Sequence, residues 1–234
     1  MTAHLHAMSF GANEPHELAH FWAGVLRREL GEDGVTVLPG EATDFPVRFV
    51  EQPGDKTGPN QMHFDLTSNW PGDQKVTVAR VLELGGRHLD IGQGPDDTHV
   101  VMADPEGNEL CVIAAGNNFL ADTAFIGALS SDGTQAVGYF WSKALGWPLV
   151  WDQDEETAIQ SLQGGSKISW GGPPVNSKTG RNRLQLDLVP AAGSGQGAEV
   201  DRLVALGATR VTTRKDGAVD MLDPDGNEFA VVPQ

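Results

Sequence analysis

Two histidines in strand-like segments are the residues best suited to metal chemistry. His6 lies in segment 5–10, where His6, Met8 and Phe10 alternate with the other face, and His63 lies in segment 61–66. Such alternation predicts strands. Imidazole suits a divalent transition metal, and two imidazoles need at least one carboxylate to form an open site that can chelate substrate oxygens.

A second metal-binding pattern occurs on an expected helix, where residues 16–20 read His-Glu-Leu-Ala-His. In zinc proteases this motif places two histidines one turn apart to bind zinc, and its glutamate activates water. The metzincin form fails, because Ala23 and Leu26 stand where glycine and histidine are required. No expected downstream helix supplies the distant glutamate of the thermolysin form. We therefore interpret the motif as a solvated helix edge.

Other candidate residues are one cysteine and four tryptophans. Cys111 is the only cysteine, so no intrachain disulfide can form. A thiol is a nucleophile only when a base or a positive field activates it, and a buried structural thiol is the more usual case. The tryptophans could wall an aromatic ligand pocket or fill the interface between the two halves; they are Trp70, Trp147, Trp151 and Trp170.

Composition and charge restrict the class of protein. The chain has 234 residues with 39% hydrophobic residues and a net charge of −16. An acidic chain repels phosphate backbones and anionic lipids, so we expect neither nucleic acid nor a membrane as a partner. It has no apolar run long enough to span a membrane and no basic, apolar secretory leader. We expect a cytoplasmic protein that acts on a small molecule.

The elements that must position these residues follow one order, which is strand, helix and three strands. A helix is expected from Pro15, with an apolar stripe that includes Phe21 and Trp22, and strands at 35–38 and 47–50 follow it. The next unit has the strand at 61–66, a helix at 76–84, strands at 87–91 and 99–102, and a hairpin over 103–113. Asp-Pro followed by Gly-Asn predicts the tight turn of that hairpin.

The second half of the chain repeats the first. The hairpin 103–113 recurs as 222–232, and Phe21-Trp22 recurs as Phe140-Trp141. Lys56-Thr57-Gly58 recurs as Lys178-Thr179-Gly180. Matched segments at a nearly constant residue offset over almost the whole chain indicate a tandem duplication. We expect two domains, residues 1–118 and 123–234.

With these residues in place, the chain resembles the vicinal oxygen chelate superfamily, which includes glyoxalase I, extradiol dioxygenases and bleomycin-binding proteins. Residues 178–188 and 223–229 are similar to its glyoxalase-like branch. The resemblance implies an α+β fold of four βαβββ modules that form two curled, mixed-sheet domains with helices outside. It also implies that each half curls its own eight strands around a cavity.

The resemblance further implies a metal site in the first domain. Superfamily ligands come from the first, fifth and last strands of a half, which here carry His6, His63 and, as the nearest carboxylate, Glu109. The family's usual carboxylate position, three residues after Asn108, holds Cys111 instead. Glu51 matches a further ligand position of glyoxalase I enzymes. The second half has Gln185 and Ala230 at the corresponding places.

Two functions remain open from sequence. The first is a metal-dependent lyase, isomerase or dioxygenase that uses zinc, iron, manganese or nickel in the first domain and no metal in the second. The second is a metal-free protein that binds a small molecule or drug. Either function suits a monomer or a homodimer.

Overall fold

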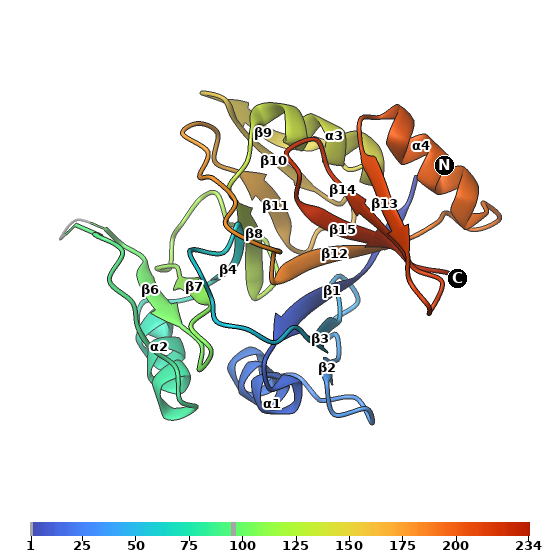
Figure 1. The fold of residues 1–234 in the computed structure, drawn as a ribbon. Helices are drawn as coiled ribbons and strands as arrows, with labels where there is room; N and C mark the ends of the chain where they lie inside the picture. Colours follow the sequence, from blue (N-terminus) through green and yellow to red (C-terminus); the bar gives the residue numbers. More distant parts are fainter. Residues whose placement is uncertain (1, 95–96) are drawn as a thin grey trace.

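The computed structural model describes residues 2–94 and 97–234, which form four modules of related structure (Figure 1). Module 1 contains β1 (His4–Ala12), α1 (Pro15–Leu26), β2 (Thr36–Val37) and β3 (Val47–Glu51). Module 2 contains β4 (Met62–Leu66), α2 (Asp73–Glu83), β5 (Arg87–His88), β6 (Val100–Ala103) and β7 (Glu109–Val112). Module 3 contains β8 (Ile126–Ser131), α3 (Gln135–Leu145), β9 (Leu149–Gln153), β10 (Glu156–Gln160) and β11 (Lys167–Trp170). Module 4 contains β12 (Leu184–Val189), α4 (Gln196–Ala205), β13 (Thr209–Thr213), β14 (Val219–Leu222) and β15 (Glu228–Val231). The expected α+β fold of four modules, with helices outside, is confirmed.

The strands form two open, mixed sheets. The first, called sheet A here, has the order β13-β14-β15-β12-β1-β3-β2 and combines modules 4 and 1. The second, sheet B, has the order β5-β6-β7-β4-β8-β11-β10-β9 and combines modules 2 and 3. At the two junctions, β1 runs antiparallel to β12 and β4 runs antiparallel to β8.

Each sheet therefore takes one module from each repeat, whereas the expectation was that each repeat would curl its own eight strands. The physical reason is that the first strand of every module needs a hydrogen-bonding partner along its open edge. The first strand of any other module can satisfy this need. The pattern of the sequence specifies the strands but not which of these similar edges meet.

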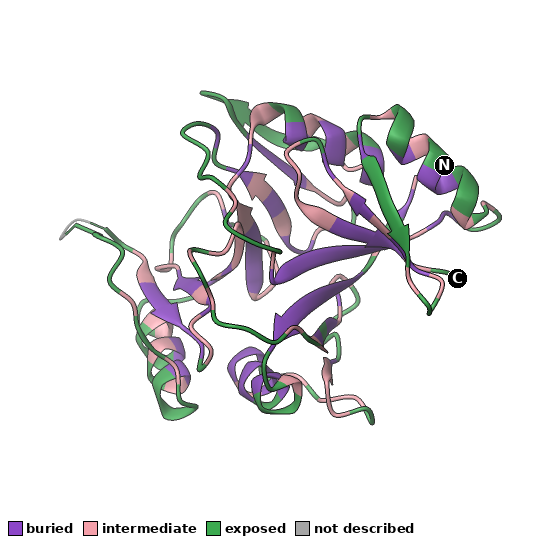
Figure 2. Cartoon of the chain, viewed as in Figure 1, coloured by how far each residue is buried: buried purple, intermediate pink, exposed green. Residues whose placement is uncertain are grey.

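One continuous core fills the space between sheets and helices. Trp22 of α1 is fully buried and lies 5.1 Å from the ring of Phe64 in β4 and 5.9 Å from that of Phe10 in β1. Phe10 belongs to sheet A and Phe64 to sheet B, and their ring centroids are 6.1 Å apart, so the two sheets share apolar contacts. In Figure 2, most of β1 and β12 is buried, and much of α4 is exposed.

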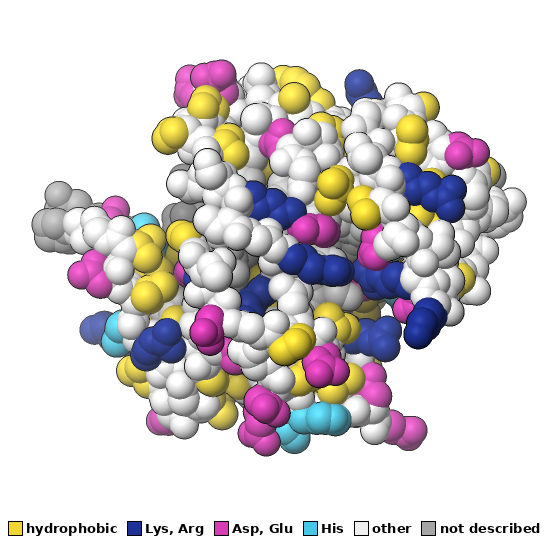
Figure 3. All heavy atoms as spheres, viewed as in Figure 1, with side chains coloured by type: hydrophobic (Ala, Val, Ile, Leu, Met, Phe, Trp, Pro, Cys, Tyr) yellow, Lys and Arg dark blue, Asp and Glu magenta, His cyan; other side chains and the backbone are white. Residues whose placement is uncertain are grey.

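The surface carries its charges unevenly. In Figure 3, acidic side chains are scattered, whereas Lys and Arg side chains gather in a band across the middle of this face. Among the described residues, no helix is long and apolar enough to cross a membrane.

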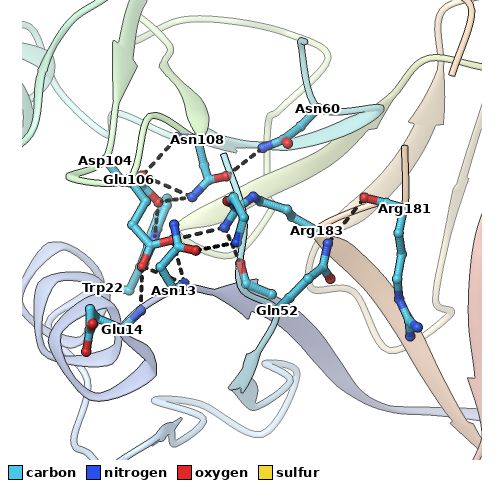
Figure 4. Close-up of polar contacts among 12 residues, drawn as sticks. Asn13, Glu14, Trp22, Gln52, Asn60, Asp104, Glu106, Asn108, Arg181 and Arg183 are labelled. Atoms are coloured by element: carbon cyan, nitrogen blue, oxygen red, sulfur yellow. Dashed lines mark hydrogen bonds and ion pairs between the residues drawn. The ribbon is translucent and has the colours of Figure 1, made fainter. Parts of the chain in front are cut away.

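Each of the two repeated hairpins holds a helix in place, and Figure 4 shows the contacts of the first hairpin. The Asp104 carboxylate accepts hydrogen bonds from Asn108 N at 2.8 Å and from Trp22 Nε1 at 3.1 Å. Glu106 accepts hydrogen bonds from the backbone N–H groups of Asn13 and Glu14 at the start of α1. Module 2 thus caps the helix of module 1.

The second repeat has the same arrangement. Asp223 accepts from Asn227 N at 2.9 Å and from Trp141 Nε1 at 3.1 Å, and Asp225 accepts from Thr134 N at the start of α3. The modules of one repeat are thus joined through hairpin and helix, while the sheets join modules of different repeats. The two repeats are therefore interlocked.

Candidate functional site

A cavity of about 710 Å³ lies against sheet B, between modules 2 and 3. Its floor includes His63 of β4, Cys111 of β7, Ser130 of β8 and Ser169 of β11. Its walls include Phe119 of the segment between the repeats and Trp151 of β9. Both repeats are therefore needed to enclose this cavity.

Three side chains converge beside the cavity, and two of them, His63 and Cys111, line it. His63 and Asp65 are two residues apart on β4 and so share one face of the strand, and Asp65 pairs with Cys111 across β4 and β7. His63 Nε2 lies 3.3 Å from Asp65 Oδ1 and 3.6 Å from Cys111 Sγ. The ligand atoms of these three residues all lie within 4.8 Å of one another. This convergence on one ring nitrogen is a geometry that could hold a metal ion.

Hydrogen bonds and charge fix the three groups. Ser130 Oγ donates to Asp65 Oδ2 at 2.5 Å, which leaves Oδ1 directed at His63. Burial opposes the charge of His63, but hydrogen bonds to Asp65 and Cys111 and the charges of these groups outweigh it and raise the pKa of His63. Cys111 is 8% exposed.

The two separations from His63 Nε2 are compatible with a tetrahedral zinc ion. Zinc binds thiolate sulfur at about 2.3 Å and imidazole nitrogen or carboxylate oxygen at about 2.0–2.2 Å. At a tetrahedral angle these lengths place nitrogen and sulfur about 3.5 Å apart, and nitrogen and oxygen about 3.4 Å apart. The observed separations of 3.6 and 3.3 Å match both edges. A nitrogen, sulfur and oxygen set also suits zinc better than magnesium or calcium.

The structure separates two of the three residues expected to bind metal. His6 is exposed on β1 of sheet A, whereas His63 lies on β4 of sheet B. Glu109 lines the cavity, but its carboxylate is paired with Lys56 and accepts from Asn60 N at 3.2 Å. Glu51 is exposed in β3 of sheet A. Of these four residues, only His63 and Glu109 line the same cavity.

Asp65 is the site residue that sequence reasoning missed. Asp65 follows His63 by two residues, so in a strand the two side chains lie on the same face. This spacing was the signal in the sequence that could have identified Asp65. Cys111 was identified only as the residue at the usual carboxylate position. The structure brings its sulfur to the histidine.

Aromatic side chains give the cavity an apolar wall. Phe119 and Trp151 contact each other edge to face with centroids 6.4 Å apart, and Trp170 is buried beside them in the lining. Of the four tryptophans named as candidates from the sequence, Trp151 and Trp170 therefore belong to the cavity. Trp70 is 53% exposed and lies elsewhere.

The His-Glu-x-x-His pattern lies away from this cavity. His16, Glu17 and His20 are exposed on α1, and His16 Nδ1 lies 3.2 Å from Gly34 O. They form the solvated helix edge that was expected.

Comparison with known proteins identifies the family. A family model described as a glyoxalase-like domain matches residues 7–113 and again residues 128–232. The chain belongs to the glyoxalase-like domain family. Its two copies cover most of the chain, which is therefore a tandem member of the vicinal oxygen chelate superfamily. No sequence among curated proteins matches it significantly.

Solved structures share the fold over almost the whole chain. Glyoxalase I from Zea mays is 14% identical, with a TM-score of 0.69 over 99% of this chain and 92% of that chain. A putative dioxygenase from Bacillus subtilis is 14% identical, with a TM-score of 0.61 over 98% of this chain and 84% of that chain. At this identity the likeness concerns the fold.

Proposed function

We propose that the protein is a metal-dependent enzyme of the vicinal oxygen chelate type, which acts on a small, partly apolar molecule that bears two neighbouring oxygens. The observation that supports this proposal is the convergence of His63, Asp65 and Cys111 beside the sheet B cavity, which His63 and Cys111 line. The three residues would hold zinc and leave a position open toward the cavity. A bound zinc ion supplies Lewis-acid polarisation of substrate oxygens.

The surrounding residues have separable tasks. Trp151, Trp170 and Phe119 provide apolar contact for the body of the substrate and exclude water from that side. Ser130 orients the Asp65 carboxylate through its short hydrogen bond. Lys56 and Asn60 N hold the Glu109 carboxylate at the rim of the cavity.

The test is metal content. Protein purified without a histidine tag is loaded with zinc, dialysed and measured by elemental analysis. We expect one zinc per chain, its loss in His63→Ala, and its retention in His6→Ala, the matched control for removing an exposed histidine. Absence of zinc in the wild-type protein, or equal loss in both variants, would contradict the proposal.

A metal-free binding protein is the second candidate, and the aromatic wall formed by Phe119, Trp151 and Trp170 favours it. In that case an apolar aromatic ligand raises the melting temperature of protein treated with a chelator. His63→Ala then retains the shift, and Trp170→Leu loses it. If zinc must be present for the shift, this alternative is wrong.

A further inference from the structure

Sheet A carries a second cavity, of about 370 Å³, that corresponds to the first by the pseudo-symmetry of the repeats. Gln185 of β12 pairs with Ser9 of β1 as His63 pairs with Ser130 in sheet B. Asp187 pairs with Ala230 as Asp65 pairs with Cys111. The histidine and the cysteine of the first cavity are thus replaced by glutamine and alanine, so this cavity lacks the same metal-binding set.

Arginines occupy other positions around the second cavity. Arg181, Arg183 and Arg214 line the second cavity, and Arg48 of β3 pairs in register with Ser9 on its floor. By the repeat register, Arg181 and Arg183 correspond to Pro59 and Gln61, and by strand pairing Arg48 corresponds to Ser169.

These arginines are a sizeable share of the basic residues of the chain. It has 16 Lys and Arg against 32 Asp and Glu. The lysines of the two repeated loops, Lys56 and Lys178, lie with Arg181 and Arg183 around a neighbouring cavity. The band of basic side chains in Figure 3 runs across this face of the molecule.

Two of the four arginines are already engaged by carboxylates. Arg183 Nη1 donates to Glu106 Oε2 at 2.9 Å and Arg214 Nε donates to Asp220 Oδ1 at 2.7 Å. Arg181 is exposed, and its guanidinium makes one hydrogen bond, to the amide oxygen of Gln185 at 3.3 Å. Within the described residues, Arg48 makes no side-chain hydrogen bond or ion pair and is exposed.

Besides Glu106 and Asp220, the carboxylates that face these arginines include Glu51, Asp187 and Asp33, whose charge interacts with that of Arg48. Glu51 is exposed, while Asp187 is 6% exposed and accepts from Ser9 Oγ at 2.5 Å. Burial raises the pKa of Asp187, against the hydrogen bond from Ser9 and the charges of Arg214, His6 and Arg48, so its negative charge is disfavoured. Arg48 and Arg181 therefore retain guanidinium donors that can receive an anion.

We propose that the sheet A cavity binds the carboxylate or phosphate group of a small molecule, with Arg181, which lines it, as the principal donor and Arg48, the strand neighbour of Ser9, as the second. A guanidinium forms two parallel, charge-assisted hydrogen bonds with either group, which an ammonium cannot reproduce. The two cavities of this chain have then diverged, since one presents a thiol, an imidazole and aromatic rings and the other presents arginines.

The experiment is titration of the intact protein with inorganic phosphate, and separately with malonate, by calorimetry at constant ionic strength set with sodium chloride. We expect saturable binding of at least one probe, and which of the two binds more tightly distinguishes phosphate from carboxylate ligands. Arg181→Ala weakens this binding about tenfold, because a charge-assisted hydrogen bond to the anion is lost. Arg181→Lys restores only part of it.

Lys75→Ala is the matched control, because it removes one exposed positive charge from α2, which lies in module 2. It should bind like the wild type. The proposal is overturned if neither probe binds more than chloride does, or if Arg181→Ala and Lys75→Ala bind equally. His63→Ala should leave this binding unchanged, which separates this site from the proposed metal site.

Discussion

Replacing Asp104 by asparagine is expected to change how the stability of the protein depends on pH. Asp104 is fully buried in the first hairpin and accepts hydrogen bonds from Trp22 and Asn108. Burial raises its pKa to about 6, although those hydrogen bonds favour the charged form. In the unfolded chain an aspartate has a pKa of about 3.9.

The sign follows from the direction of that shift. The folded state holds the proton more tightly than the unfolded state, so the contribution of Asp104 to stability is complete below pH 4 and is lost as pH rises through about 6. Between pH 5 and pH 7 the two pKa values give a loss of about 1.3 kcal/mol in the free energy of unfolding. Asp223 in the second hairpin has a pKa of about 6 for the same reason, so we expect a similar loss there.

Urea denaturation at pH 5 and pH 7 measures this effect. The stability difference between wild type and Asp104→Asn should shift by about 1.3 kcal/mol between the two pH values, in favour of the wild type at pH 5. Comparing the two proteins at each pH cancels the change in stability that titration of the other acidic residues causes in both, since the chain has 32 Asp and Glu residues. Asp201→Asn, at an exposed position of α4, is the control and should give no such shift. A difference for Asp104→Asn that is the same at both pH values would refute the reasoning.

Two further predictions concern an ion pair between modules and packing within one module. Arg183→Ala should cost about 3 kcal/mol of stability, because it leaves the largely buried Glu106 carboxylate without its ion pair (Figure 4). A double-mutant cycle with Glu106→Gln should show coupling, and additive effects would contradict the pairing. Gly138→Ala in α3 should be destabilising by about 1–3 kcal/mol, because its Cβ would stand 2.0 Å from Thr157 Oγ1. Gly197→Ala in α4 meets no atom within 4 Å and should gain a few tenths of a kcal/mol from helix propensity, so equal effects of the two substitutions in thermal denaturation would be a contrary result.

Local structure could be predicted from the sequence because it depends on local chemistry. The apolar stripe containing Trp22 predicts a buried helix face, and Trp22 is fully buried. Asp-Pro with Gly-Asn predicts the hairpins, and Gly107 and Gly226 adopt positive φ values of 87° and 83°. The additional role of Asp104, as acceptor for a helix tryptophan 82 residues away, has no local signature.

The composition of the site could be predicted only in part, because it depends on which strands become neighbours. A metal set of His6 and His63 requires β1 and β4 to lie in one sheet. The pairing of β1 with β12 and of β4 with β8 places the two histidines in different sheets. The same pairing brings Trp151 and Trp170 of the second repeat to His63 and Cys111 of the first.

Cobalt binding tests the central claim most directly, since cobalt(II) takes the place of zinc in sites of this kind and reports its ligands by absorption. The wild-type protein loaded with one cobalt ion should show a thiolate-to-cobalt charge-transfer band in the near ultraviolet, because Cys111 is the only thiol in the chain. Cys111→Ser should lose the band, and His6→Ala should keep it. A wild-type spectrum without this band, at a metal loading of one ion per chain, would contradict a metal site at His63, Asp65 and Cys111.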